Sequence, residues 1–337
     1  MKHKPICCAL ALAMASLSTA EATTLDDVRA RGYVKCGVGY DVPGFSASDD
    51  RGRWAGLDVE TCRAVAAAVF GDPDKVRFTA LQSKVRFTAL QSGEVDLLVR
   101  QTTWTLKRDT VLGFKFTGVN FYDGTGFMLR KSLGVSNARQ LAGASICITA
   151  GTTTELAVAD WFRNRNMTYE PVTFEKADEA IRVYESGRCD AYASYLGGAA
   201  GHRLKFAHPQ DHIFLPEIIS KEPCGPVVRQ GDDQWFNIVR WVLFAMVDAE
   251  ELGITSGNAW EMRGSNNPKI RHLLGLEGDF GVGLGLDNDW AYNIIKTVGN
   301  YGEVFARTLG PDTPIGLPRG LNRLWTEGGV MYAPPIR

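Results

Sequence analysis

The sequence has almost no net charge, which limits the partners it can bind. Its 337 residues include 37 Lys and Arg against 38 Asp and Glu, so the formal net charge is −1. No excess of basic residues is left to neutralise phosphates, and this composition excludes a typical nucleic-acid-binding protein. With 45% hydrophobic residues the chain is globular, and its length suggests about two domains.

Metal-binding and catalytic signatures are also missing. Only five histidines occur, and Pro209 between His208 and His212 breaks the helical face that two metal ligands would share. There is no CxxC, GxSxG, GxxxxGK[ST] or HExxH motif. The glycine-rich segment 281–285 lacks the helix and the downstream acid of a dinucleotide site. We therefore expect neither a metal nor a cofactor.

The first 22 residues have the pattern of a signal peptide. A basic start is followed by an apolar run over Ile6–Leu17, and Ala20 and Ala22 place small side chains where a signal peptidase cleaves. The run of about twelve residues is shorter than the roughly twenty that cross a bilayer. We predict export, with cleavage after Ala22.

Predicted strands and helices alternate along the rest of the chain. The strands are expected at 33–38, 76–79, 95–99, 145–149, 169–174 and 189–193, and the helices at 58–70, 84–91, 155–164 and 177–185. A strand–helix–strand order implies parallel strands covered by helices on both faces. Because the pattern occurs twice, we predict two α/β lobes with a cleft between them.

Residues 75–83 and 84–92 are identical copies of the sequence KVRFTALQS. Two copies are too few to build a solenoid. We predict a strand in the first copy and a helix in the second, with Ser83 as the N-cap and Gly93 after the helix. The surroundings, not the intrinsic propensity, would then decide the conformation.

Five cysteines remain after the predicted cleavage, and an odd number in an oxidising compartment indicates two disulfides and one free thiol. Cys36 lies on the first predicted strand and Cys62 on the helix that packs against it. Cys147 and Cys189 fall on two strands of the second lobe, within bonding reach. We predict the pairs Cys36–Cys62 and Cys147–Cys189, with Cys224 free; buried thiols are the alternative.

Two segments place polar groups just after strands, where open α/β sheets bind ligands. The first contains Thr103, Trp104 and Arg108, and a guanidinium suits a carboxylate. In the second, Thr152 has the spacing to cap a helix whose free N–H groups, beginning at Thr153, can bind an anion. Each segment also has a purely structural interpretation, as a solvated charge and as an ordinary helix cap.

Six segments together resemble a known family: Gly56–Glu60, Arg86–Asp96, Thr102–Asp109, Gly151–Glu155, Gly187–Asp190 and Asp287–Asn293. They are similar to the periplasmic general L-amino-acid-binding proteins of ABC importers. The resemblance implies an α/β, two-lobed type II periplasmic-binding-protein fold, each lobe a mainly parallel sheet flanked by helices, with a helical C-terminal extension. Lobe 1 would comprise residues 23–122 and 229–337 and lobe 2 residues 123–228, and a ligand would close them like a hinge.

The resemblance also implies roles for the polar residues. Arg108 would hold the ligand's α-carboxylate beside Thr103, and Thr153 would complete that site from lobe 2. In the family an aspartate binds the α-ammonium, but this chain has Tyr195 there, and a phenol carries no charge at neutral pH. Either Asp41 accepts the ammonium while the Tyr195 ring stacks on it as a cation–π partner, which we favour, or the ligand lacks an amine.

The function implied by the resemblance is that of a soluble periplasmic receptor. It would bind an amino acid as a monomer, deliver it to an inner-membrane ABC permease and carry out no reaction. The alternatives are a receptor for a non-amine carboxylate, a receptor that reports to a sensor, and a periplasmic dehydratase on the same fold. A dehydratase would need a buried acid in the cleft, for which the sequence offers only Asp41.

Overall fold

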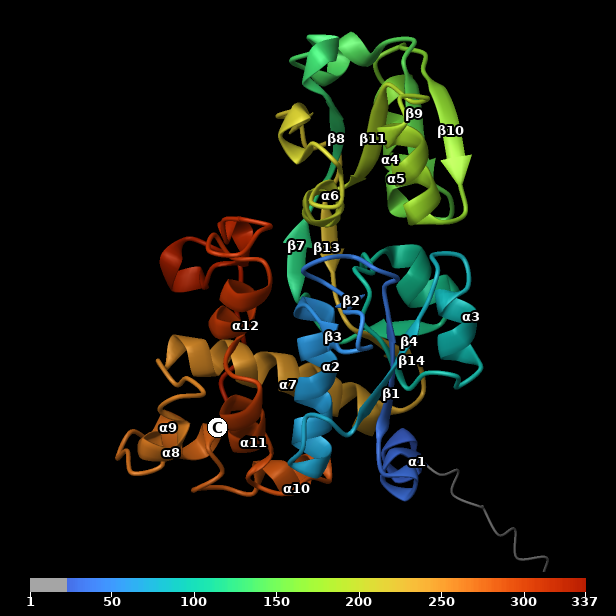
Figure 1. Cartoon of the computed structure of the whole chain (residues 1–337). Helices are drawn as coiled ribbons and strands as arrows, with labels where there is room; N and C mark the ends of the chain where they lie inside the picture. Colours follow the sequence, from blue (N-terminus) through green and yellow to red (C-terminus); the bar gives the residue numbers. More distant parts are fainter. Residues whose placement is uncertain (1–22) are drawn as a thin grey trace, which may run out of the picture.

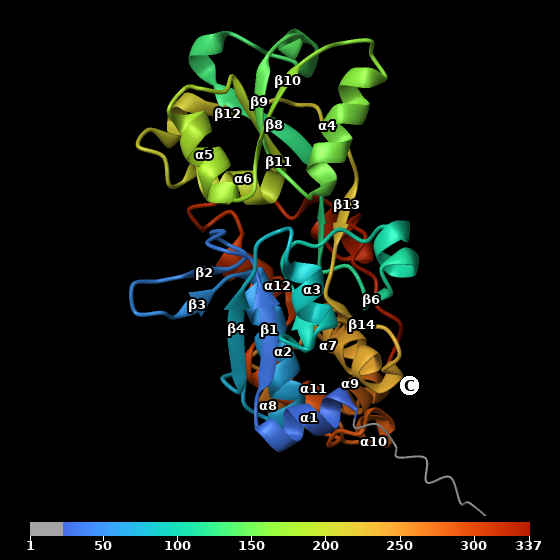
Figure 2. The same ribbon diagram turned by 90° about the vertical axis from the view of Figure 1, so that its right-hand side faces the viewer.

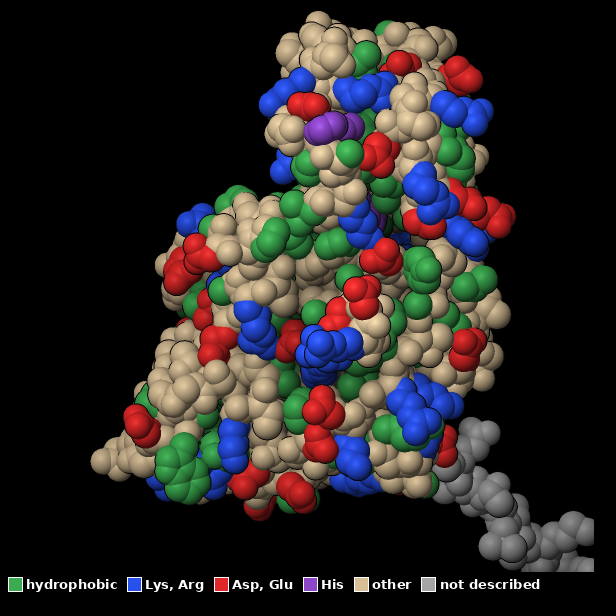
Figure 3. Space-filling view, viewed as in Figure 1, with side chains coloured by type: hydrophobic (Ala, Val, Ile, Leu, Met, Phe, Trp, Pro, Cys, Tyr) green, Lys and Arg blue, Asp and Glu red, His purple; other side chains and the backbone are tan. Residues whose placement is uncertain are grey.

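A computed structural model describes residues 23–337 as two lobes stacked end to end (Figure 1). Residues 1–22, with the predicted signal peptide and its cleavage site, lie outside the described residues. Within the part that the structure describes, no helix is both long and apolar enough to cross a bilayer. On the face in Figure 3, side chains of both charge signs are interspersed, in keeping with the balanced composition.

Lobe 1 is built on a five-stranded sheet in the order β4-β1-β5-β14-β6. Its strands are β1 (Val34–Val38), β4 (Val76–Ala80), β5 (Leu97–Leu98), β6 (Phe114–Phe116) and β14 (Val227–Arg229). The helices of this lobe include α1 (Thr24–Arg31), α2 (Leu57–Phe70), α3 (Arg86–Gln91) and α7 (Asp233–Glu251), and a small hairpin is formed by β2 (Ala47–Ser48) and β3 (Trp54–Ala55).

Lobe 2 repeats this plan with the strand order β10-β9-β11-β8-β12. The strands are β8 (Thr125–Arg130), β9 (Ser145–Thr149), β10 (Glu170–Phe174), β11 (Ala191–Tyr195) and β12 (His212–Phe214). Helices α4 (Thr153–Arg163), α5 (Ala177–Glu185) and α6 (Leu196–Arg203) pack around the sheet, and α6 lies on the side of lobe 2 that faces lobe 1 (Figure 2). The predicted pair of α/β lobes is confirmed.

Both sheets are mixed, where the sequence suggested mainly parallel ones. In each sheet one half is parallel (β4-β1-β5 and β10-β9-β11) and the other half is antiparallel. The reason is the path of the chain. The parallel strands run toward the other lobe and end at the cleft, whereas β8 and β14 begin there, just after the chain has crossed.

The two crossings are short strands, β7 (Phe121–Asp123) and β13 (Glu222–Cys224), which pair antiparallel to each other. Strand β14 already belongs to the sheet of lobe 1, so the lobe boundary drawn from the sequence after residue 228 falls inside this strand. The lobes are thus joined by two adjacent crossings, the connection that the resemblance implies for a hinge.

A helical C-terminal extension follows α7. It contains α8 (Ala259–Met262), α9 (Pro268–Leu273), α10 (Phe280–Leu284), α11 (Trp290–Thr297) and α12 (Tyr301–Thr308). The extension also braces the first crossing. The Tyr301 hydroxyl donates to the Asn120 carbonyl at 2.9 Å, and the Asn322 side chain accepts from the Tyr122 N–H at 2.7 Å and donates to its carbonyl at 3.1 Å.

The duplicated segment adopts two conformations, as predicted. The first copy forms β4, and the second forms α3. Ser83 is not the N-cap, however: α3 begins after Val85, whose side chain makes no capping bond. The helix is stabilised by packing instead, because Ala89 and Leu90 are buried in a cluster with the core of lobe 1.

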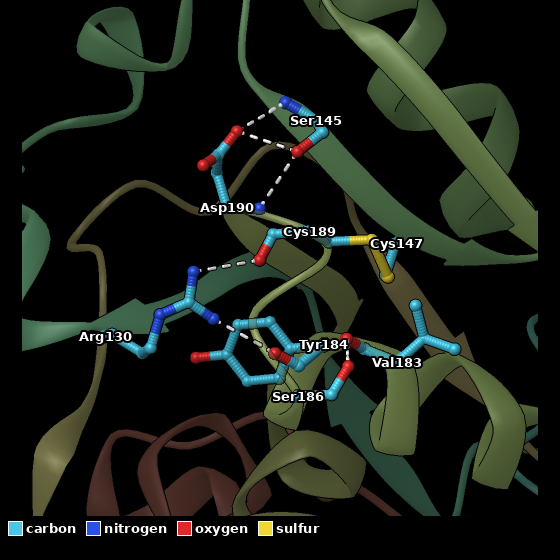
Figure 4. The surroundings of a disulfide bond; sticks show 8 residues. All are labelled: Arg130, Ser145, Cys147, Val183, Tyr184, Ser186, Cys189 and Asp190. Atoms are coloured by element: carbon cyan, nitrogen blue, oxygen red, sulfur yellow. Dashed lines mark hydrogen bonds between the residues drawn. A yellow bond between two sulfur atoms is a disulfide. The ribbon is translucent and has the colours of Figure 1, made fainter.

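The predicted disulfides Cys36–Cys62 and Cys147–Cys189 are both present, with Cα atoms 6.2 and 5.7 Å apart. The first ties β1 to α2. The second ties β9 to the residues before β11, next to the hydrogen bonds between Asp190 and Ser145 (Figure 4). Among the described residues Cys224 is the remaining cysteine, buried and unbridged.

Each disulfide should stabilise the lobe that contains it. The bridges span 26 and 42 residues, and closing loops of that length in the unfolded chain is worth about 3–4 kcal/mol each. We expect Cys36→Ala/Cys62→Ala and Cys147→Ala/Cys189→Ala each to lower the free energy of unfolding by about that amount in urea titrations. Cys224→Ser, which closes no loop, is the control for loss of a buried sulfur.

Candidate functional site

Three side chains predicted for the site meet between the lobes in one hydrogen-bonded cluster. The Tyr195 hydroxyl lies 2.7 Å from Thr103 Oγ1 and 2.6 Å from Thr153 Oγ1, and the two threonine oxygens are 3.2 Å apart. Thr103 follows β5, Thr153 begins α4 and Tyr195 ends β11. Burial raises the pKa of Tyr195 to about 12, so the phenol is neutral at physiological pH.

Glu222 completes this cluster, and the sequence analysis missed it. Its buried carboxylate accepts hydrogen bonds from four hydroxyl groups. Thr103 and Thr153 donate to Oε2, the latter at 2.8 Å. Thr125 donates to Oε1 at 3.2 Å, and Ser220 donates to the same oxygen at 2.6 Å. These bonds replace the hydration that a buried carboxylate loses. Nothing in the local sequence marks Glu222, because three of the four donors come from distant segments.

Strand β13 also places Thr103. The Trp104 N–H donates to the Pro223 carbonyl at 2.8 Å, and the Gly225 N–H donates to the Thr102 carbonyl at 3.1 Å. Residues 102–104 therefore run alongside the crossing strand, which fixes the threonine hydroxyl next to Glu222.

Arg108 is buried next to residues 102–104, with only 7% of its surface exposed. One Nη atom donates to the Thr103 carbonyl at 2.7 Å, and the guanidinium carbon lies 5.2 Å from the centre of the Phe87 ring. The guanidinium thus supports the segment that carries Thr103, while its remaining N–H groups are not committed to any residue from 23 to 337.

A cavity of about 60 Å³ lies on the other side of the cluster, between the lobes. Lobe 1 contributes Ser83, Arg86, Arg100 and Gln101 to its wall, and lobe 2 contributes mainly hydroxyl-bearing residues, including Thr152, Thr154, Ser194 and Tyr195. No Asp or Glu lines this cavity. Its wall therefore presents positive charge and hydrogen-bonding groups.

Arg86 and Arg100 lack protein partners for much of their hydrogen-bonding capacity. Arg86 is only 2% exposed, and within residues 23–337 its Nε and one Nη have no hydrogen-bond partner. The Nε of Arg100 is likewise buried without a partner. An Nη of Arg100 reaches Ser83 Oγ at a long 3.5 Å. Burial, and secondarily the neighbouring arginines, lower the pKa of Arg86; burial lowers that of Arg100 to about 10. Guanidinium groups keep their proton in proteins, so both side chains carry a positive charge.

Neither arginine was identified from the sequence. Arg86 is in the second copy of the repeat, where the predicted helix gave no sign of which face is buried. Arg100 directly follows the predicted strand 95–99, so the strand-end argument that selected Thr103 applied to it equally.

Asp58 sits behind the cavity wall rather than in it. It is 2% exposed, and the Gln101 amide donates to its carboxylate at 3.4 Å. Gln101 itself has a left-handed backbone, with φ of 48°. Such strain in a residue other than glycine is concentrated at ligand sites. Burial raises the pKa of Asp58 to about 7, although the charge of Arg100 opposes this.

The other predicted residues lie at the edges of the site. The Thr152 hydroxyl caps α4 by accepting the Glu155 N–H at 3.2 Å, but the Glu155 side chain accepts from Gly151 rather than closing a capping box. Asp41 pairs with Lys205 of lobe 2 at 2.6 Å, and its side chain is 52% exposed. It does not line the cavity.

Trp104 faces a second, open groove of about 480 Å³ on the far side of the hydroxyl cluster. It is 39% exposed and stacks on Phe116, with ring centroids 5.7 Å apart. This groove is larger than the arginine-lined cavity, but it is open and lined in part by exposed apolar side chains such as Leu156 and Ile218. Buried unpaired cations make the smaller cavity the stronger candidate for binding an anion.

Among residues 23–337 no group of three His, Cys, Asp or Glu side chains is placed to hold a metal ion. The arrangement is instead that of a recognition site. It combines guanidinium groups, hydroxyls and the start of helix α4, all of which bind carboxylates.

Comparison with known proteins gives a consistent result. The family described as bacterial extracellular solute-binding proteins, family 3, matches residues 34–255. The general L-amino acid-binding periplasmic protein of Rhizobium johnstonii is 54% identical, with 100% of both chains covered. The glutamate/glutamine/aspartate/asparagine-binding protein of Rhodobacter capsulatus is 53% identical, again with 100% of both chains covered.

Among solved structures, an ABC transporter periplasmic binding protein from Brucella ovis with glutathione bound has a TM-score of 0.92 and 55% identity. It covers 94% of this chain and 100% of its own. The type II fold inferred from the resemblance is confirmed, including the C-terminal extension beyond the family match.

The raised pKa of Asp58 should be visible in the pH dependence of stability. Between about pH 4 and pH 7 the folded protein holds a proton that the unfolded chain has lost, so the free energy of unfolding falls as the pH rises. Asp58→Asn should remove this part of the decline. Urea unfolding across that range measures it, and the exposed Asp50→Asn variant should follow the wild type. Equal slopes for Asp58→Asn and wild type would contradict the assignment.

Proposed function

The chain belongs to the bacterial extracellular solute-binding proteins of family 3, and we propose that its cargo is a small, carboxylate-bearing solute of the amino-acid class. The protein is the periplasmic substrate-binding component of an ABC transporter. The observation that carries the proposal is the pair of buried guanidiniums, Arg86 and Arg100, which face an inter-lobe cavity without protein partners.

The relatives support this cargo class. The Rhizobium johnstonii protein is named for general L-amino acids, the Rhodobacter capsulatus protein for glutamate, glutamine, aspartate and asparagine, and the Brucella ovis structure contains glutathione. All of these compounds carry at least one carboxylate.

The proposed cycle uses the hinge. A ligand carboxylate would bind the unpaired N–H groups of Arg86, Arg100 and Arg108, all from lobe 1, and the hydroxyl-bearing wall of lobe 2 would close over it, so that both lobes hold one ligand. Closure would then bury the guanidiniums, and the closed form would dock on the inner-membrane permease. Two surface ion pairs, Lys205–Asp41 and Lys84–Glu175, already join the lobes, but exposed pairs of this kind contribute little on their own.

The finer parts of the proposal concern processing and assembly. We propose cleavage of the signal peptide after Ala22, action as a monomer, and no catalysis. The absence of catalysis is supported by the family, whose relatives in this comparison are transport proteins. In addition, the buried acid Asp58 does not reach the cavity wall.

A thermal-shift screen tests the cargo class. A ligand at 100 times its dissociation constant adds about 2.7 kcal/mol to the free energy of unfolding, which raises the melting temperature by several degrees. We expect amino acids or closely related carboxylates to produce such shifts, whereas sugars and polyamines leave the melting temperature unchanged. Stabilisation by uncharged sugars alone would contradict the proposal.

Arg108 should carry a large share of the affinity. Arg108→Ala leaves a buried carboxylate without its cation, a loss of about 3–5 kcal/mol for a desolvated pair. We therefore expect the dissociation constant to rise more than a hundredfold in calorimetric titrations. A folded Arg108→Ala protein with near-normal affinity would place the carboxylate elsewhere.

A further inference from the structure

The charge around the cavity is one-sided. Burial lowers the pKa of both Arg86 and Arg100, and neighbouring positive charge adds to this: that of Arg100 and Arg108 at Arg86, and that of Arg108 at Arg100, where the charge of Asp58 acts in the opposite direction. Two of them line the cavity, and no carboxylate does. The protein surface, in contrast, has both signs interspersed on the face in Figure 3.

The nearby acids are already engaged. Glu222 accepts four hydroxyl groups. Asp123 accepts the N–H groups of Gly124 and Gly197 at 2.8 and 3.0 Å, and burial raises its pKa to about 7. Asp58 lies behind the wall, bonded to Gln101. None of them has a direct ion pair with Arg86 or Arg100 among residues 23–337.

A place for an ammonium group is hard to find in the same cavity. The Tyr195 hydroxyl is shared between Thr103 and Thr153 and is neutral. His202 also lines the cavity, but burial lowers its pKa to about 4, so it too is neutral. Asp41, our favoured acceptor from the sequence, is paired with Lys205 outside the cavity. An ammonium here would face two guanidiniums without a counter-charge.

We propose that the preferred ligand is a small dicarboxylate whose two negative charges are shared among Arg86, Arg100 and Arg108, and for which an α-amine is dispensable. This inference rests on the proposed function and narrows its cargo. A second carboxylate supplies the missing counter-charge, and it bonds to the N–H groups that the protein leaves unpaired. Acidic amino acids and deaminated dicarboxylates share this chemistry, and they differ only in the amine.

Calorimetric titration with matched ligands measures separately what the second carboxylate and the α-amine contribute to affinity. The panel is L-glutamate, glutarate and 2-oxoglutarate, which keep both carboxylates, against L-glutamine and L-alanine, which have one. We expect the three dicarboxylates to bind at least a hundredfold more tightly than glutamine and alanine. We further expect glutarate or 2-oxoglutarate to bind at least as tightly as glutamate.

The duplicated segment provides a matched pair of variants. Arg77 and Arg86 occupy the same position in identical nine-residue copies, but Arg77 is exposed on β4 and Arg86 is buried at the cavity. We expect Arg86→Met to weaken dicarboxylate binding more than a hundredfold. Because it removes an unpaired buried charge, the same variant should raise the melting temperature of the ligand-free protein. Arg77→Met should leave dicarboxylate affinity unchanged.

Tyr195→Asp tests the amine directly. A carboxylate beside Thr103 and Thr153 would offer the ammonium its acceptor, so this variant should shift preference from glutarate toward glutamate. A melting curve and circular dichroism spectrum matching the wild type would show that it is folded.

The possible failures differ. If alanine or glutamine binds as tightly as the dicarboxylates, or if folded Arg86→Met retains its affinity, the dicarboxylate inference is wrong although the amino-acid-class function stands. If glutamate binds more than tenfold tighter than both deaminated compounds, the amine is recognised and that part is overturned. If none of the five compounds binds but another amino acid stabilises the protein in the thermal-shift screen, the inference fails and the proposed function stands; if no amino acid or related carboxylate stabilises it, both fail.

Discussion

Buried guanidinium groups without a direct ion pair are the constraint on which the cleft depends. A guanidinium removed from water loses several kcal/mol of hydration unless partners replace it. In this protein the replacement is incomplete at Arg86 and Arg100. The closed form is therefore least favourable at the place where a ligand binds, and an anion that pairs with these groups stabilises closure more than any surface contact between the lobes. Recognition and closure become a single event.

Such a site requires rigid lobes, and the fold provides them. Each lobe has a buried apolar core, and each is crosslinked internally by one disulfide. The topology then brings the strand ends together: the parallel strands of both sheets end at the cleft, and the crossing strand β13 supplies Glu222 to the threonines that follow them.

The sequence predicts those parts of the site that follow from local patterns. Thr103 and Thr153 follow within a few residues of strand ends, and the two disulfides follow from the order of the elements, so all could be placed in advance. Glu222 and Asp58 could not, because their partners are distant in the sequence. Asp41 is the acid that the sequence suggests for the cleft, but it lies on the surface, paired with Lys205. Local patterns locate strand ends, but charge pairing depends on which segments meet.

The two copies of KVRFTALQS show within one chain that the role of an arginine depends on the segments around it and not on its local sequence. In the first copy the backbone is held by β1, Arg77 points to solvent, and its guanidinium lies 3.9 Å from the centre of the Tyr33 ring. In the second copy the backbone is helical, and the apolar residues of the same sequence enter the core of lobe 1. That packing turns Arg86 toward the other arginines. An identical residue with identical neighbours is thus a solvated surface charge in one place and a ligand-facing cation in the other. Because the nine residues are the same, the difference must come from the sheet edge and the cleft that receive them.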